Sequence, residues 1–183
     1  MIYMINPNTL IKQLKKLPLS SKKIFKHINV KRLKMNKQIV YFSNSGNNER
    51  LAKRIAHYYG VNATPIIPVN PYPNKYHELT SQAKIERFRH INVAIKPVKL
   101  ESNINTLILV SPIWYADLPR PVVTFLKQVQ RSFQHVVFVS DKFMIGFGIC
   151  KRTLKKYLSK QTTIDLIAAN SNNFSLVKQY FQK

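Results

Sequence analysis

Five short apolar runs alternate with five segments of helical character between residue 38 and the end of the sequence. The predicted strands cover residues 39–42, 61–69, 107–110, 136–139 and 163–168. Apolar side chains at helical spacing predict helices over residues 51–59, 76–89, 119–129, 149–159 and 174–181. Strands that alternate with helices pair in parallel through right-handed crossovers and carry helices on both faces. We therefore predict one α/β domain, residues 36–183, with a five-stranded parallel sheet.

The second apolar run predicts an edge strand. The carboxyl ends of the strands predict where a ligand binds. Pro65 and Pro68 interrupt the second run, and proline cannot donate to a sheet ladder, so this strand is predicted at the edge of the sheet. Ligands of such sheets bind outside the carboxyl ends of the strands. The loops at that edge are residues 43–48, 111–118 and 141–148, and we expect function there.

The first of these loops has the composition of a phosphate-binding turn. It combines hydroxyl, amide and glycine residues with the start of a helix, whose N–H groups and dipole attract anions. It is not a Walker loop, and it lacks the three glycines of the dinucleotide fingerprint. The alternative is a polar connection in which Asn48 only caps the helix.

The second loop carries the single tryptophan, Trp114, beside Tyr115. Two adjacent aromatic rings at a sheet edge can stack on a flat heterocycle. Alternatively, Trp114 packs over the end of the sheet and touches no ligand. Cys150, at a predicted helix start, is either a thiol with a pKa lowered by the dipole or a buried, inert thiol, and free cysteines are more commonly buried. The five histidines show no metal-ligand spacing, and His135 is expected to be structural.

The net charge of +23 comes from 30 basic and 7 acidic residues. Residues 1–34 include nine basic and no acidic residues, so we expect residues 1–35 to form a separate basic extension. It is interpreted as a flexible tail, as an arm that binds nucleic acid or an anionic membrane, or as a segment before the true start at Met35. No apolar run reaches the roughly 18–20 residues of a membrane span, and one cysteine fits a reducing compartment, so a cytoplasmic protein is expected.

Spaced motifs in residues 38–160 resemble the flavodoxin family. Residues 39–47, Ile-Val-Tyr-Phe-Ser-Asn-Ser-Gly-Asn, are similar to its first strand and phosphate loop. Residues 112–126 are similar to the P-I-W-[WY] segment of one flavodoxin subfamily, residues 71–86 to its second-helix region, and residues 146–148 to its third loop. The resemblance implies a flavodoxin-like, three-layer doubly wound fold with strand order 2-1-3-4-5.

The resemblance also implies flavin mononucleotide (FMN) as the cofactor and assigns residues to it. The residues expected at the phosphate are Ser43, Ser45, Gly46, Asn47 and Asn48. The residues expected to border the ring are Pro112, Ile113, Trp114, Tyr115 and Ala116, with Asp141, Gly146 and Gly148 closing the other side. Bulky Phe143, Met144 and Ile145 stand where the family is rich in glycine. Ala116 stands where glycine often permits a peptide flip, and a flip that needs positive φ would be opposed by about 1 kcal/mol.

None of these residues is expected to act as a nucleophile or acid, because the flavin would carry the chemistry. We expect an FMN-binding redox protein, and its basic surface favours an NAD(P)H-dependent flavin or quinone oxidoreductase, with acidic partners or anionic substrates. One alternative is an electron-transfer shuttle without its own substrate. Another is a degenerate binding protein that uses its basic surface for nucleic acid or membrane. The sequence leaves open the electron donor, the acceptor and whether a homodimer completes the site.

Overall fold

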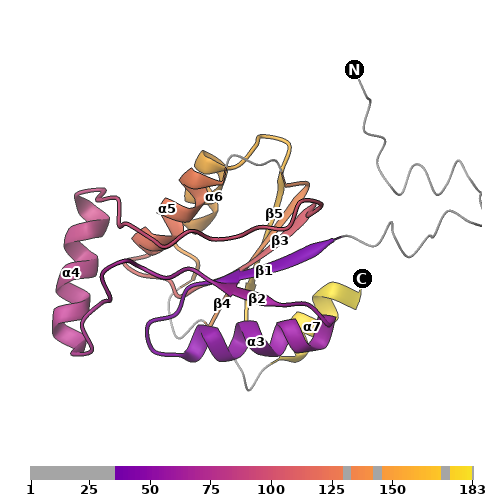
Figure 1. The fold of residues 1–183 in the computed structure, drawn as a ribbon, viewed down its shortest axis with the longest axis horizontal. Coiled ribbons are helices and arrows are strands. Elements are labelled where there is room, and N and C mark those ends of the chain that lie inside the picture. The colour runs from indigo at the N-terminus through magenta and orange to yellow at the C-terminus, as the bar shows by residue number, and fades with distance from the viewer. Residues whose placement is uncertain (1–35, 130–132, 142–145, 170–173, 183) are drawn as a thin grey trace, which may run out of the picture. The chain divides into compact units, whose positions relative to one another are not determined.

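The computed structural model describes residues 36–129, 133–141, 146–169 and 174–182, and the expected extension over residues 1–35 lies outside them. Five parallel strands form one sheet in the order β2-β1-β3-β4-β5 (Figure 1). The strands are β1 (Lys37–Tyr41), β2 (Ala63–Pro65), β3 (Thr106–Val110), β4 (His135–Ser140) and β5 (Thr163–Ala168). The helices are α3 (Asn47–Tyr59), α4 (Tyr76–Phe88), α5 (Arg120–Gln128), α6 (Cys150–Tyr157) and α7 (Ser175–Gln182). This topology confirms the predicted flavodoxin-like fold and strand order.

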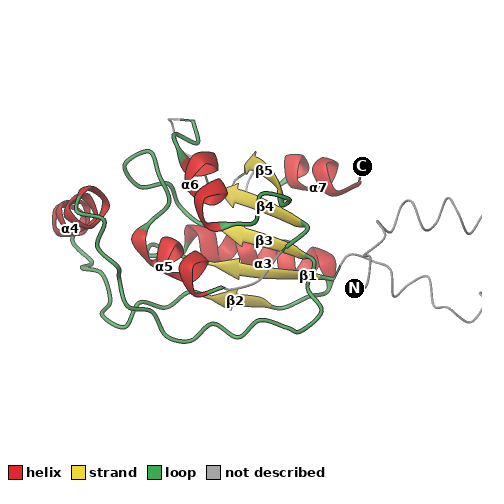
Figure 2. Ribbon diagram, turned by 90° about the horizontal axis from the view of Figure 1, so that it is seen from above, coloured by secondary structure: helices red, strands yellow, loops and turns green. Residues whose placement is uncertain are grey.

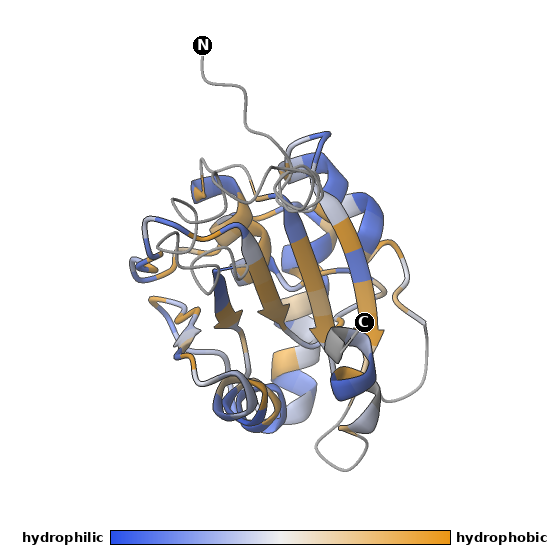
Figure 3. Cartoon of the chain, turned by 90° about the vertical axis from the view of Figure 1, so that its right-hand side faces the viewer, coloured by the Kyte–Doolittle hydropathy of each residue, from blue (hydrophilic) through white to orange (hydrophobic). Residues whose placement is uncertain are grey.

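The three central strands form the core of the sheet. Val40, Leu109 and Phe138 lie side by side in register on β1, β3 and β4, and all three are fully buried. Every residue of β3 is buried, because helices cover both faces of a parallel sheet. Figure 3 shows the result as apolar colour along these strands and polar colour on the outer helix surfaces.

Two helices cover each face of the sheet (Figure 2). On one face, α3 and α7 pack against one set of alternating strand residues, with Leu51, Ile55 and Val177 fully buried. On the other face, α5 and α6 pack against the alternate set, with Val122 and Leu154 fully buried. None of the helices in the described ranges is both long and apolar enough to cross a bilayer.

Helix α4 differs from the other four because it covers neither face of the sheet. Figures 1 and 2 show it beyond the carboxyl ends of the strands. Its buried residues are Ala83 and Glu86, whereas Tyr76 and Phe88 are largely exposed. A polar contact anchors it, because the hydroxyl of Tyr72 donates to Glu86 Oε2 at 2.5 Å. The helix therefore stands at the edge where the sequence predicts the site.

Strand β2 is shorter than the predicted strand over residues 61–69, which extends too far. It ends at Pro65, and the chain beyond it turns to a different partner. Val69 N–H donates to Ala94 O at 2.9 Å and Lys96 N–H donates to Ile67 O at 2.8 Å, with Pro68 opposite Ile95 in an antiparallel bridge. The prolines lack the N–H groups that a longer ladder with β1 would need. The predicted edge position of β2 is confirmed.

A polar cluster joins β4, β5 and α7 at the other end of the sheet. Asp165 Oδ2 accepts a hydrogen bond from the hydroxyl of Tyr180 and lies 2.8 Å from His135 Nε2. Hydrogen bonding from Tyr180, and then from His135, lowers the pKa of Asp165 below its ordinary value, although partial burial opposes this. His135 therefore has a structural partner in the sheet.

Replacing Asp165 by asparagine should reduce stability in a pH-dependent way. Because the pKa of Asp165 is lowered in the folded state, its carboxylate stabilises the fold above the ordinary pKa of about 3.9. That stabilisation is lost as the pH falls through the lower folded value. Since the side chain is 41% exposed, Asp165→Asn should lower the free energy of unfolding at pH 7 by at most about 1 kcal/mol. Urea unfolding at pH 7 and near pH 2 measures the difference, which should disappear in acid.

Glu78→Gln is the matched control, because it removes an exposed carboxylate that pairs with Lys75. It should change stability at pH 7 less than Asp165→Asn does. A loss from Asp165→Asn that is equal at both pH values would contradict the assignment of the effect to the charged carboxylate.

Candidate functional site

Three loops begin side by side at the carboxyl edge of the sheet. Phe42 N–H donates to Val110 O at 2.9 Å, and Ser111 N–H donates to Val139 O at 3.1 Å. These bonds continue the ladder just past the ends of β1, β3 and β4. The three predicted site loops therefore meet at one edge.

The first loop combines an uncapped helix start with a buried hydroxyl that lacks a hydrogen-bond partner among the described residues. Gly46 precedes α3 with a left-handed φ of 83°, and no side chain of the described residues caps the helix. Ser43 Oγ is buried and has no hydrogen-bond partner among the described residues. Buried hydroxyl groups are normally paired, so this one is suited to hydrogen-bond a ligand at this loop. Ser45 and Asn47 are exposed at the same turn.

Arg50 adds a positive charge to this loop, although the motif does not predict it. Its guanidinium donates to Asn47 Oδ1, and its Nη1 lies 3.6 Å from where a β-carbon on Gly46 would stand. The signal in the sequence is a basic residue in the first turn of a helix, where the dipole disfavours it unless an anion binds nearby. The residues present therefore fit a phosphate group.

Asn48 connects the first loop to the third. It is 4% exposed, and its Oδ1 accepts a hydrogen bond from Asp141 N–H at 3.2 Å. Asn48 therefore does not cap α3, because its side-chain oxygen accepts a hydrogen bond from the third loop instead. Partial burial raises the pKa of Asp141, and the positive charge of Arg50 opposes this rise.

The second loop forms a two-residue hairpin. Trp114 N–H donates to Asp117 O at 2.9 Å, and Asp117 N–H donates to Trp114 O at 3.0 Å. Tyr115 and Ala116 between them have φ values of 48° and 58°, as a type I′ turn requires. Ala116 already has a positive φ because the hairpin imposes it, and the cost that alanine adds to a peptide flip stays a prediction.

Trp114 serves both the core and a cavity. Its ring meets Phe42 and Tyr72 edge to face, with centroids 5.3 and 5.0 Å apart. It also lines a cavity of about 280 Å³ between the second loop and α4, where Tyr115 OH donates to Thr80 O at 2.6 Å. The other lining residues are Tyr76, Leu79, Ala83 and Ile113. Pro112 precedes them, half-buried.

The third loop packs directly on the second. Ile149 N–H donates to Ala116 O at 2.8 Å. A β-carbon on Gly148 would lie 2.1 Å from that same oxygen, so only glycine fits here. Gly146 is exposed with a φ of 20°. The bulky residues Phe143, Met144 and Ile145 lie outside the described residues.

The side chain of Asp117 holds the second loop in place, although no sequence motif predicts this role. It is 4% exposed, and its Oδ1 accepts hydrogen bonds from Thr153 Oγ1 at 2.6 Å and from Leu118 N–H at 2.8 Å. Its Oδ2 lies 3.0 Å from Arg87 Nε in an ion pair. The available signal is that it is the only acidic residue between Glu101 and Asp141.

The thiol of Cys150 is not part of this site. It is fully buried, and burial raises its pKa to about 12. The prediction of a buried, inert thiol is confirmed, and the alternative of a lowered pKa is wrong. The described residues contain no group of three or more histidine, cysteine or acidic side chains that could hold a metal ion.

The strand order and the helices on both faces of the sheet define a flavodoxin-like fold. A candidate flavoprotein from Bacteroides uniformis superposes with a TM-score of 0.65 at 22% identity, over 81% of this chain and 98% of that one. A candidate flavoprotein from Bacteroides eggerthii gives 0.63 at 23% identity, over 80% and 96%. A flavoprotein in complex with FMN from Lactobacillus acidophilus gives 0.63 at 14% identity, over 80% and 99%. No protein-family model matches the sequence, and no curated protein matches it significantly.

Gly148→Ala should destabilise the protein more than Gly60→Ala does. Both glycines have positive φ, 51° and 63°, so each substitution adds about 1 kcal/mol of left-handed strain. Only Gly148 is also crowded, because nothing lies within 4 Å of a β-carbon at Gly60. We expect Gly148→Ala to lower the free energy of unfolding by at least about 2 kcal/mol, as measured by urea unfolding. Equal losses would contradict the close packing of the second and third loops.

Proposed function

We propose that this chain binds FMN at the carboxyl edge of its sheet and acts as a flavin-dependent redox protein. The observation that carries the proposal is the buried, unpaired Ser43 hydroxyl beside the uncapped start of α3. A helix start with free N–H groups is suited to a phosphate dianion. The shared fold with an FMN complex from Lactobacillus acidophilus supports the choice of this phosphate ester.

In this proposal, different loops bind different parts of the cofactor. Ser43, Ser45, Gly46, Asn47 and Arg50 hold the phosphate, and Asn48 keeps the third loop beside it. The residues that border the ring are Pro112, Ile113, Trp114, Tyr115 and Ala116, with Asp141, Gly146 and Gly148 on the other side. When bound, FMN supplies hydride and electron transfer.

The protein's own part is binding and orientation. The Tyr115–Thr80 hydrogen bond holds the second loop against α4, and the Ile149–Ala116 bond holds it against the third loop. A loop fixed on two sides keeps its aromatic side chains in place for a flat ring. Edge-to-face contacts with Phe42 and Tyr72 hold the ring of Trp114 in place.

We favour an NAD(P)H-dependent oxidoreductase of the cytoplasm over the two alternatives. Flavodoxin-type shuttles usually present an acidic face to basic partners, whereas the strong positive charge of this chain is suited to acidic partners or anionic substrates. A shuttle without its own substrate is the second candidate. A colourless protein that binds nucleic acid in a salt-sensitive manner would instead favour a degenerate binding protein.

Arg50→Gln should weaken FMN binding while leaving riboflavin binding unchanged. Its guanidinium lies at the phosphate loop, and a charge-assisted hydrogen bond contributes about 1.5–3 kcal/mol, so we expect a loss of about tenfold or more in affinity. Ser43→Ala should act in the same direction. Titration followed by flavin fluorescence measures both ligands.

Lys53→Gln is the matched control, because it removes the same charge one turn further along α3, where Lys53 pairs with Glu49. At fixed ionic strength it should change FMN affinity less than about twofold. Equal losses of FMN and riboflavin binding in Arg50→Gln would contradict the placement of the phosphate.

Addition of NADH or NADPH to the FMN-loaded protein distinguishes the reductase from the shuttle. Rapid bleaching of the yellow flavin without any added enzyme is the result expected for a reductase. Stopped-flow absorption measures it, with free FMN at the same concentration as the control. Bleaching that needs an added reductase would assign the chain to the shuttle class instead.

A further inference from the structure

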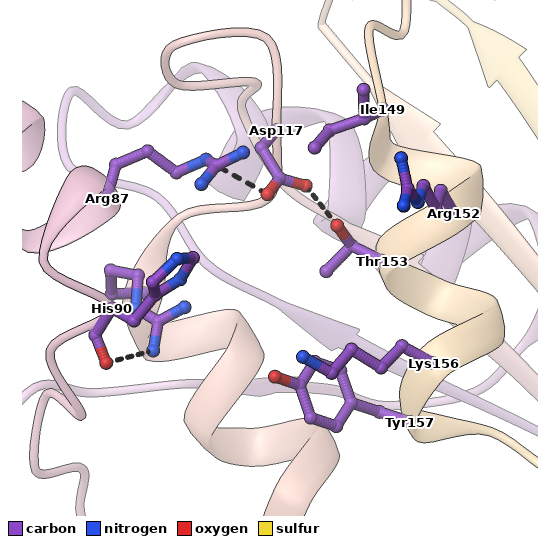
Figure 4. A pocket seen from close by; sticks show the side chains of 9 residues that line it. Arg87, His90, Asp117, Ile149, Arg152, Thr153, Lys156 and Tyr157 are labelled. Atoms are coloured by element: carbon purple, nitrogen blue, oxygen red, sulfur yellow. Dashed lines mark hydrogen bonds and ion pairs between the residues drawn. The ribbon is translucent and has the colours of Figure 1, made fainter.

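A second cavity, of about 360 Å³, lies between α4, α5 and α6 (Figure 4). It is separate from the cavity beside Trp114, and Figure 4 shows Arg87 of α4 and the α6 side chains around one space, with Asp117 between them. Its lining residues are Arg87, His90, Asp117, Arg120, Ile149, Arg152, Thr153, Lys156 and Tyr157. The volume is in the range of pockets that hold small organic ligands.

The cavity has a strong excess of positive charge. Arg87, Arg120, Arg152 and Lys156 contribute four cationic side chains, whereas Asp117 is the one carboxylate in the lining. Asp117 pairs with Arg87. Among the described residues, no carboxylate lies within 4.0 Å of the other three cations. Arg120, Arg152 and Lys156 therefore have no ion-pair partner among the described residues, and the cavity keeps a net excess of positive charge.

Because Arg120 is buried, the excess of positive charge in this cavity extends below the protein surface. It is 5% exposed, and its Nε and Nη2 donate to the carbonyl oxygens of Ile91 and His90 at 2.6 and 2.9 Å. Carbonyl groups satisfy hydrogen bonds but do not neutralise a charge. Burial lowers the pKa of Arg120, which is the effect of a desolvated cation. The carboxylates of Asp117 and Glu86 offset part of this cost, but neither forms an ion pair with Arg120, so an anionic ligand in the cavity would stabilise it further.

We propose that this cavity binds a small phosphate-bearing anion. Arginine side chains offer paired N–H groups that match phosphate oxygens, and Lys156 adds a mobile point charge. Ile149 and the ring of Tyr157 supply an apolar wall for the organic part of such a ligand. The cations converge from three helices into a cavity instead of lying along a flat face, which favours a small ligand over nucleic acid or a membrane.

The test is calorimetric titration of inorganic pyrophosphate into the full chain, with and without FMN, at fixed ionic strength. The double variant Arg152→Gln/Lys156→Gln removes two charges that line the cavity at its exposed side, so it spares the buried Arg120. We expect saturable binding by the unmodified protein and a loss of at least about tenfold in the variant, from two charge-assisted contacts. Arg152→Lys/Lys156→Arg should retain most of the affinity.

Lys151→Gln/Lys155→Gln is the matched control. It removes the same charge from the same helix, at exposed positions that do not line the cavity. It should change pyrophosphate affinity less than about twofold. Equal losses in the two double variants, or the absence of saturable binding, would overturn the proposal and assign the attraction to diffuse surface charge.

Competition identifies the source of the phosphate. If NADP⁺ displaces pyrophosphate and NAD⁺ does not, the cavity holds the extra phosphate of a phosphorylated nicotinamide nucleotide. If neither displaces it, the ligand is a different phosphate-bearing molecule, and the site is still supported. A protein that fails to bind FMN yet shows the tenfold difference between the double variants would overturn the proposed function and support this cavity.

Discussion

The arrangement of the site depends on the buried carboxylate of Asp117. It connects the second loop to α6 through Thr153 and to α4 through Arg87. It also accepts a hydrogen bond from Leu118 N–H within its own loop. Removing one partner of a buried ion pair typically costs about 3–5 kcal/mol, because it leaves a charge without compensation. Asp117 therefore determines where the aromatic hairpin, the start of α6 and the far end of α4 lie relative to one another.

The fold could be predicted because its strongest constraints are local in the sequence. The runs over residues 107–110 and 136–139 are apolar at every position, which is typical of strands buried on both faces. Pro65 and Pro68 were sufficient to place β2 at the edge, although not to give its length. That length depends on residues 94–96, which pair with the chain after β2 and have no strand pattern of their own.

The contacts of the site could be predicted only where a motif spans neighbouring residues. The first loop, residues 43–48, is contiguous, so its composition is visible in the sequence. The Arg87–Asp117 pair joins residues 30 positions apart, and nothing local to either residue indicates the other. The left-handed conformation of Tyr115 and Ala116 is likewise set by the closing of the hairpin and not by residue type, because neither residue prefers it.

Helix α4 forms a wall of both cavities, yet little apolar surface attaches it to the sheet. Ala83 and Glu86 are its buried residues, and polar contacts through Tyr72, Asp117 and Tyr115 hold it in place. Elements with few buried apolar contacts open at a lower free energy than the core does. We therefore expect the amide hydrogens of α4 to exchange as a unit of low local stability, whose opening would reshape the carboxyl edge of the sheet and the basic cavity together.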